Sequence, residues 1–352
     1  MIRKNVFLPL SLFCMTQIAA DNGIQIPEGK ITDYHCIHPD ITPSAGPRVV
    51  DGVDMFFTGD YIYWTAREDN LEYASTGYTN DDDHSVDSGL SKSPKSQYKT
   101  GFKAGFGFNF GHDCWDSLLN YTWFQSNNNK SSITADYEDG LTPSFDPYIS
   151  LGSADFFNSA KSKWDFHFNT IDWELGRNCY ISKYLSLRPF VGLKGSWQKQ
   201  TLKNCYKGEV ADLAFSYHNN TNSSFWGVGI RSGLNTSWHL SESWSLYGDL
   251  ALSALWSSFD NHRNDSYHTP SLGKIHPVST RGSTNTLAPV LELAMGLRKD
   301  VWFFQDRLHI GLQAGWEEQI WWDQNHLSLN KGLAREGNLY LQGLTARLRL
   351  DF

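Results

Sequence analysis

The decapeptide GFKAGFGFNF, residues 101–110, alternates between two kinds of side chain. Four phenylalanines and Ala104 occupy the even positions, while glycines, Lys103 and Asn109 occupy the odd ones. Side chains of an extended chain point alternately to opposite faces, so this segment has one aromatic face and one small, polar face. It therefore predicts a strand that separates an apolar environment from a wet one.

Two architectures use such a strand. A soluble sandwich buries the aromatic row under a second sheet, whereas a membrane barrel turns it to lipid and the polar row to the lumen. Repetition favours the barrel, because nine further segments alternate in the same way and give ten predicted strands with residues 99–110. The nine are residues 54–66, 115–126, 163–176, 183–198, 224–238, 243–258, 286–299, 306–322 and 338–352.

The connections between these segments alternate in length. Short links at 110–114, 176–182, 239–243 and 299–306 are separated by long polar links at 67–98, 127–162, 199–223, 259–285 and 323–337. Bacterial outer-membrane barrels have short periplasmic turns and long extracellular loops. The pattern therefore predicts an all-β fold, a transmembrane antiparallel up-and-down β-barrel of about ten strands. The stretch EVADLAFSY, residues 209–217, leaves twelve strands as the alternative.

One predicted strand departs from the alternation. Phe166 and Phe168 have the opposite parity from Ile171, Trp173 and Leu175. A β-bulge between the two groups would return all five side chains to one face.

The composition and the N-terminal residues indicate which partners the protein has and whether it is exported. Only 19% of the 352 residues are charged, against about 25% in typical soluble domains. The formal net charge is −8 and the bases are scattered, so no nucleic acid partner is expected. Residues 1–20 place Arg3 and Lys4 before a short apolar run, which predicts a signal peptide for Sec-dependent export. Proline-rich residues 21–53 predict an extension, periplasmic or in the barrel mouth, before the barrel of residues 54–352.

Four blocks of the chain resemble a known family. These are GDYIYWTAREDNLEYA (59–74), GFKAGFGFNFGHDCWDSLLNYTWF (101–124), WELGRNCYISKYLSLRPFVGLKGSW (173–197) and the terminal LTARLRLDF. They resemble the major-outer-membrane-protein-like, pore-forming barrels of Legionella and of Chlamydia-related bacteria. The resemblance covers residue 54 to the end and implies a porin-like protein of the outer membrane. It supplies no catalytic residues.

Aromatic residues near strand ends predict interfacial girdles, because amphipathic rings prefer the level of the lipid headgroups. The candidates are Tyr61, Tyr63, Trp64, Trp115, Trp123, Trp197, Trp226, Trp238, Trp244, Trp256, Trp316, Trp321 and Trp322. The terminal Phe352 shares parity with Leu348 and Leu350 and resembles the signal that the barrel assembly machinery recognises. Outer-membrane lipid and this machinery are therefore expected partners.

Charged residues of the inward parity predict the lining of a pore. A charge facing lipid at the midplane costs about 2–4 kcal/mol, so such residues belong inside. They could form a mixed-charge channel for small polar solutes or ions; alternatively, ion pairs close the interior, since side chains can already fill a barrel of about eight strands. The predicted pore-lining residues are Asp60, Lys103, Asp116, Asp172, Glu174, Arg188, Lys194, Arg231, Asp249, Glu292, Arg298, Arg307, Glu317, Arg347 and Arg349.

The mature chain retains four cysteines, Cys36, Cys114, Cys179 and Cys205. Cys114 and Cys179 fall in the first two predicted periplasmic turns. We hypothesise that they bridge each other or crosslink to envelope proteins, as the chlamydial resemblance implies; four free thiols are the alternative. A homo-oligomer stays open as a further partner.

No enzyme is expected, because Gly-x-Ser-x-Gly and His-Glu-x-x-His motifs are missing. The run DDDH at 81–84 is interpreted as a solvated loop tip, and the spacing of His262, His268 and His276 suits no metal. We therefore expect no catalytic residues, no cofactor and no metal. The leading function is passive diffusion through the lumen; the alternative is a closed barrel that acts as a structural or adhesive surface protein through its loops.

Overall fold

The computed structural model describes residues 49, 52, 54–76, 89–110, 114–135, 141–144, 156–210, 213–269, 273–327 and 337–352. The chain divides into two units, Met1–Tyr34 and His35–Phe352, and every described residue belongs to the second. The predicted signal peptide, all but two residues of the predicted extension, and the DDDH run lie outside the described residues. Within the described part, no helix is long and apolar enough to cross a bilayer.

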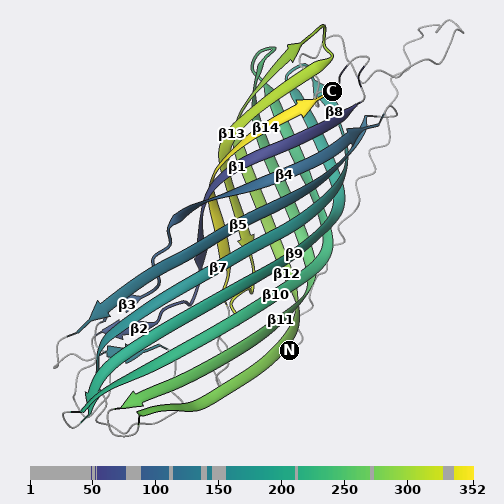
Figure 1. The fold of residues 1–352 in the computed structure, drawn as a ribbon. Helices are drawn as coiled ribbons and strands as arrows, with labels where there is room; N and C mark the ends of the chain where they lie inside the picture. The colour runs from purple at the N-terminus through teal and green to yellow at the C-terminus, as the bar shows by residue number, and fades with distance from the viewer. Residues whose placement is uncertain are drawn as a thin grey trace, which may run out of the picture. The chain divides into compact units, whose positions relative to one another are not determined.

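Ten long strands form a closed antiparallel barrel, as the alternation predicts (Figure 1). Consecutive long strands pair with one another, and β1 pairs with β14 from Phe56–Asp351 to Glu68–Leu339, which closes the ring. The long strands are β1 (Met55–Glu68), β4 (Tyr98–Asn109), β5 (Trp115–Thr134), β7 (Phe156–Arg177), β9 (Leu185–Val210), β10 (Leu213–His239), β11 (Trp244–Thr269), β12 (Gly273–Phe303), β13 (Leu308–Trp321) and β14 (Leu339–Asp351).

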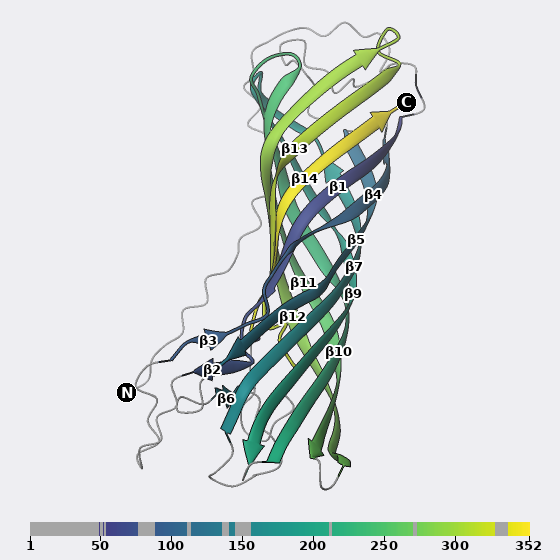
Figure 2. The same cartoon turned by 60° about the vertical axis from the view of Figure 1, so that its left-hand side comes forward.

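Four short strands accompany the barrel: β2 (Ala74–Thr76), β3 (Ser91–Lys92), β6 (Leu141–Pro143) and β8 (Cys179–Ser182). Strands β2, β3 and β6 lie together at the end remote from the C-terminus of β14 (Figure 2). The twelve-strand alternative is wrong, because the described residues of EVADLAFSY continue β9 and β10 instead of forming a separate hairpin.

Several strands extend far beyond the membrane. A transmembrane strand needs about 9–11 residues, whereas β9 to β12 contain 26 to 31 residues each. The predicted loops at 127–162, 199–223 and 259–285 are therefore strand over much of their length. The inward–outward alternation continues there, but the outward side chains change from apolar to polar, as at Lys199, Thr201 and Lys203. An apolar outward row marks only the part of a strand that lipid surrounds.

Strand β7 runs without the predicted bulge. Its pairing with β9 is regular from Ser159 to Gly176, and Phe166 and Phe168 are fully buried on the same inward face as Asp172. The prediction failed because the interior is apolar at this level. Both faces of the strand therefore carry aromatic side chains.

The opening decapeptide lies in β4 with the predicted orientation. Phe102 and Phe108 are 45% and 40% exposed on the outer surface, while Lys103 is buried inside. The inward glycines leave room for neighbours: a Cβ at Gly107 would lie 2.2 Å from the Phe56 ring. The alternation therefore separates lipid from a filled interior.

Exposed aromatic side chains gather near both ends of the lipid-facing surface, as Tyr63, Tyr98, Trp197, Trp226 and Trp316 do on the long-loop side and Phe57, Tyr184, Trp238, Trp244 and Phe303 do on the turn side. Two of the predicted girdle residues are placed wrongly. Trp64 and Trp321 are fully buried inside the barrel.

The register can be tested with a charge on the outer face. Val191 is 60% exposed midway along the lipid-facing part of β9. We expect Val191→Arg to lower the free energy of unfolding by about 2–4 kcal/mol, because arginine at the midplane must leave water. Urea titration of protein in phospholipid vesicles, followed by tryptophan fluorescence, measures this. Ser224→Arg on β10, beyond the girdle residue Trp226, is the control and should change stability by less than about 0.5 kcal/mol; equal losses would contradict the register.

Candidate functional site: the barrel interior

Two layers of inward side chains fill the barrel. Going from the short turns toward the long loops, β7 presents Glu174 and Asp172 and then Phe168 and Phe166. Strand β13 changes likewise from Glu317 to Trp321. A charged layer therefore lies on the periplasmic side of an aromatic layer.

Three bases connect four acids at the centre of the charged layer. Arg231 donates through Nη1 to Glu174 and through Nη2 to Glu292 Oε2 at 3.0 Å. Arg188 donates through Nε to Asp116 Oδ2 at 2.8 Å and through Nη1 to Glu174 Oε2 at 3.0 Å. Lys194 Nζ lies 2.6 Å from Asp172 Oδ1 and 3.0 Å from Glu292 Oε1. Because β7, β9, β10 and β12 all contribute, the network spans the lumen instead of following one wall.

Further pairs complete the charged layer. Lys103 Nζ on β4 lies 2.5 Å from Glu317 Oε1 on β13, and the Thr345 hydroxyl donates to the other oxygen of Glu317 at 2.9 Å. Arg347 donates through Nε and Nη2 to both oxygens of Asp60. Asp249 accepts from the amide of Asn235 at 2.8 Å. The mixed charges are thus matched to each other.

A cluster of charged side chains around His309 lies at the short-turn end of the charged layer. The two ring nitrogens of His309 each lie 2.9 Å from a carboxylate, Nδ1 from Asp351 and Nε2 from Asp300. Arg298 and Arg349 donate to the same two carboxylates. Sequence reasoning missed Asp300, His309 and Asp351, although each shares parity with a predicted lining residue on its own strand.

The structure places fourteen of the fifteen predicted pore-lining residues on the inner face of the wall. Twelve of them line one cavity of about 160 Å³, while Asp60 and Lys194 are buried in ion pairs beside it. Arg307 is the exception: it is exposed in the turn between β12 and β13, because β13 begins only at Leu308. Whether the cavity conducts stays a prediction.

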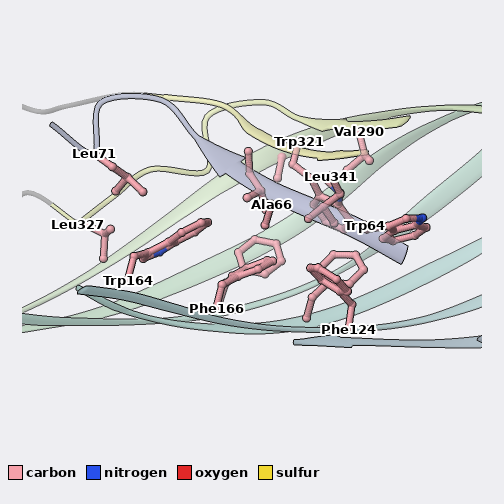
Figure 3. Packing of buried hydrophobic residues seen from close by; sticks show 14 of the residues in the cluster. Trp64, Ala66, Leu71, Phe124, Trp164, Phe166, Val290, Trp321, Leu327 and Leu341 are labelled. Atoms are coloured by element: carbon pink, nitrogen blue, oxygen red, sulfur yellow. The ribbon is translucent and has the colours of Figure 1, made fainter. Parts of the chain in front are cut away.

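The aromatic layer crosses the whole lumen (Figure 3). Nine of the ten long strands contribute buried side chains to it, and at this level β4 contributes Gly101 beside Ile62. Its members are Ile62, Trp64, Ala66, Leu71, Phe124, Trp164, Phe166, Phe168, Leu202, Phe225, Leu255, Phe259, Ala288, Val290, Trp321, Leu327, Leu339 and Leu341.

Ring contacts in this layer join opposite walls. Phe168 and Trp321 meet edge to face with centroids 5.4 Å apart, although β7 and β13 are five strands apart around the ring. Trp321 also contacts Phe225 of β10 at 6.2 Å. The buried indole N–H groups are satisfied: Trp64 donates to Thr345 and Trp164 to Gln200, each at 3.1 Å. Side chains from opposite walls therefore meet within this layer.

The charged layer and the aromatic layer contact each other through cation–π interactions. Lys103 Nζ lies 4.8 Å from the centroid of the Trp64 ring, and Lys194 Nζ lies 5.8 Å from that of Trp321. Lysines buried this deeply are stabilised by both a carboxylate and an aromatic face.

Beyond the aromatic layer, the extended strands have their own core of mainly aromatic side chains, including Tyr73, Phe157, Tyr206, Tyr217 and Tyr267. A fully buried pair, Arg263 and Asp265, packs beside it and forms hydrogen bonds with the Tyr217 hydroxyl.

In the described residues no group of histidine, cysteine and acidic side chains could hold a metal ion. His262 contacts the Ser279 hydroxyl at 3.3 Å.

The predicted Cys114–Cys179 bridge is wrong for this structure. Cys114 is disulfide-bonded, whereas Cys179 and Cys205 are free thiols. The two turns are close in space, since the Asn178 amide donates to the Cys114 carbonyl at 3.0 Å, but the sulfur of Cys114 is already bonded to a cysteine other than Cys179.

The C-terminal Phe352 lies at the short-turn end. Its ring stacks on Phe57 at 5.6 Å, and its backbone exchanges two hydrogen bonds with Met55. The ring is 36% exposed on the outer surface.

A closed barrel of antiparallel strands with an apolar outer band, two aromatic girdles and charged side chains on its inner face is an outer-membrane β-barrel. The chain belongs to the family described as Legionella pneumophila major outer membrane protein precursor, whose model matches residues 53–352. It is therefore a protein of the bacterial outer membrane. No curated protein matches the chain.

Similar solved structures are distant. The outer membrane protease OmpT from Escherichia coli is 12% identical, with 87% of this chain and 100% of that chain covered and a TM-score of 0.41. A FadL homologue from Pseudomonas aeruginosa is 8% identical, with 85% and 89% covered and a TM-score of 0.24. The toluene transporter TodX from Pseudomonas putida is 6% identical, with 91% and 98% covered and a TM-score of 0.25. At this distance no property of those proteins is transferred to this chain.

The Lys103–Glu317 pair tests the charged layer. We expect Lys103→Met to lower the free energy of unfolding by about 3–5 kcal/mol, because it leaves a buried carboxylate without its cation. Adding Glu317→Gln should restore much of the loss, since the amide keeps polar contact with Thr345 and carries no charge. Urea unfolding of both variants measures this. Additive losses in the double variant would show that the pair is not coupled.

The stability of the barrel should depend on pH through Glu68, a buried residue beyond the outer girdle. Burial raises the pKa of this carboxyl from 4.5 to about 8; Gln200 offsets part of the rise and Asp69 adds to it. The folded state therefore binds the proton more tightly than the unfolded state, and its stability falls as pH rises between those values, by up to about 5 kcal/mol. Urea midpoints measured from pH 5 to 9 should decrease for the wild type, whereas Glu68→Gln should flatten the curve. A curve unchanged by the substitution would contradict this assignment.

Proposed function

We propose that this protein is a closed outer-membrane barrel that acts as a structural surface protein, with its extended strands and loops as the interacting surface. The observation that carries the proposal is the aromatic layer, to which nine of the ten long strands contribute. The Phe168–Trp321 contact joins opposite walls, so side chains occupy the axis itself.

Barrel size agrees with closure. About eight strands already give an interior that side chains fill, whereas open aqueous porins have about 16–18. Ten strands add little width, and bulky aromatic side chains and ion pairs take up that space here. The proposed role is not enzymatic, and it requires neither a cofactor nor a metal.

Passive diffusion of small polar solutes or ions is the second candidate. The cavity of about 160 Å³ favours it, because Arg188, Arg231, Glu174 and Asp249 line it with both signs of charge. In that function the aromatic layer would have to separate to connect this cavity with the outside. Asp116→Asn and Arg188→Gln would then change ion selectivity.

Single-channel recording in a planar bilayer distinguishes the two candidates. We expect the refolded mature wild type to give no discrete current steps. The triple variant Trp64→Ala, Phe168→Ala and Trp321→Ala should give steps that scale with salt, because it removes three buried rings of the aromatic layer, two of which meet across the lumen. Trp197→Ala, which shortens a lipid-facing girdle residue, is the matched control and should stay silent. Discrete steps from inserted, heat-modifiable wild type would contradict closure and support diffusion.

Two further partners follow from the outer surface. We propose that the exposed Phe352 ring is recognised by the barrel assembly machinery, and that the apolar band contacts outer-membrane lipid.

A further inference from the structure

A band of lysines lies above the outer aromatic girdle on three adjacent strands. Strands β5, β7 and β9 are hydrogen-bonded neighbours, and their outward side chains form rows across the sheet. The girdle row is Trp123–Asn169–Trp197, and the rows above it carry Lys130, Lys161, Lys163, Lys199, Lys203 and Lys207, which we call the lysine band. We propose that the lysine band binds the phosphate-bearing headgroup of an outer-leaflet glycolipid of the lipopolysaccharide type.

The first argument is a repulsion between lysines that the single carboxylate of Asp165 offsets only in part. Lys163 pairs directly with Lys130 on one side and with Lys203 on the other, so three ammonium-bearing residues stand in one cross-strand row. Like charges in directly opposite positions destabilise a sheet. An anion that bridges the row would remove this cost.

The protein itself supplies few negative charges to offset those of the lysine band. Among the described residues, Asp165 is the only acid on the outward face of these strands between the girdle and Lys207. Its Oδ1 already accepts from the Asn128 amide at 2.8 Å, and its Oδ2 lies 2.8 Å from Lys163 Nζ. Lys130 and Lys203 are exposed beside it. The band therefore presents a net positive surface.

The band is local, and apolar surface lies directly below it. At the same level the neighbouring strand β10 presents only uncharged residues, Asn220, Asn222 and Ser224. Below the girdle the same three strands expose Leu119, Trp173, Val191 and Leu193 by 42–60%. Acyl chains can lie against the apolar part while the headgroup reaches the lysines. One lipid molecule thus satisfies both surfaces.

The height of the band selects the class of lipid. His167 and Lys199 stand one row above the girdle, and the Lys130–Lys163–Lys203 row stands six residues above it on β9. Six residues span about 20 Å along a strand, or about 15 Å of height at a tilt of 35–45°. The headgroup layer of a phospholipid leaflet is only about 5–7 Å thick. A phosphorylated sugar headgroup, which extends farther from the acyl chains, fits the upper rows.

The test measures binding of the detergent-solubilised mature protein to purified lipopolysaccharide and to the same lipid after enzymatic dephosphorylation. We expect Lys130→Gln/Lys163→Gln/Lys203→Gln to weaken binding of the phosphorylated lipid about 100-fold, because each surface lysine contributes about fivefold. The control Lys92→Gln/Lys183→Gln/Lys274→Gln removes the same charge elsewhere and should stay within about twofold of wild type.

A second readout separates binding from folding. In detergent without the lipid, the band variant should unfold at a urea concentration equal to or higher than that of the wild type, because the repulsion is relieved. Equal affinity of wild type and band variant for lipopolysaccharide would overturn the proposal. Equal affinity of the wild type for the dephosphorylated lipid, or full competition by millimolar inorganic phosphate alone, would overturn it as well. If the triple variant does not fold, Lys203→Gln and Lys203→Arg are compared, and only the glutamine should weaken binding.

Discussion

Complete pairing of the backbone within a closed ring is the constraint on which this structure depends. Lipid offers no hydrogen bonds to an exposed strand edge, so β1 must pair with β14 and every long strand with two neighbours. Closure fixes the direction of each side chain, because alternate residues then face either lipid or the enclosed space. The apolar outer band, the girdles and the inward charges all follow from this geometry.

The enclosed space is filled in two chemically different ways. In the charged layer, Arg231 and Lys194 bridge carboxylates from different strands, and the attraction offsets the loss of hydration. In the aromatic layer, Phe168 and Trp321 meet from opposite walls and need no counterpart of opposite charge. A pore through this barrel would have to displace both kinds of contact. Residues from around the whole ring therefore contribute to the filling of the interior.

Beyond the membrane the same strands continue under different rules. Water replaces lipid outside, so polar residues such as Thr201 and Asn222 can face outward while Tyr206 and Tyr217 pack inside. On β5, β7 and β9, lysines lie above the outer aromatic girdle. From the membrane outward, the outer surface thus has an apolar belt, an aromatic girdle and a local positive band.

Local alternation was sufficient to predict the ten strands, the short turns and the inward side of fourteen charged residues, because parity depends only on an extended backbone. It could not identify which charges pair, since partners such as Lys103 and Glu317 are 214 residues apart and meet only after closure. It misplaced Trp64 and Trp321 and required a bulge near Phe166, because an aromatic residue has the same sequence signature facing lipid or a dry interior. Only the ring of strands, by setting how much space remains inside, makes those side chains core residues.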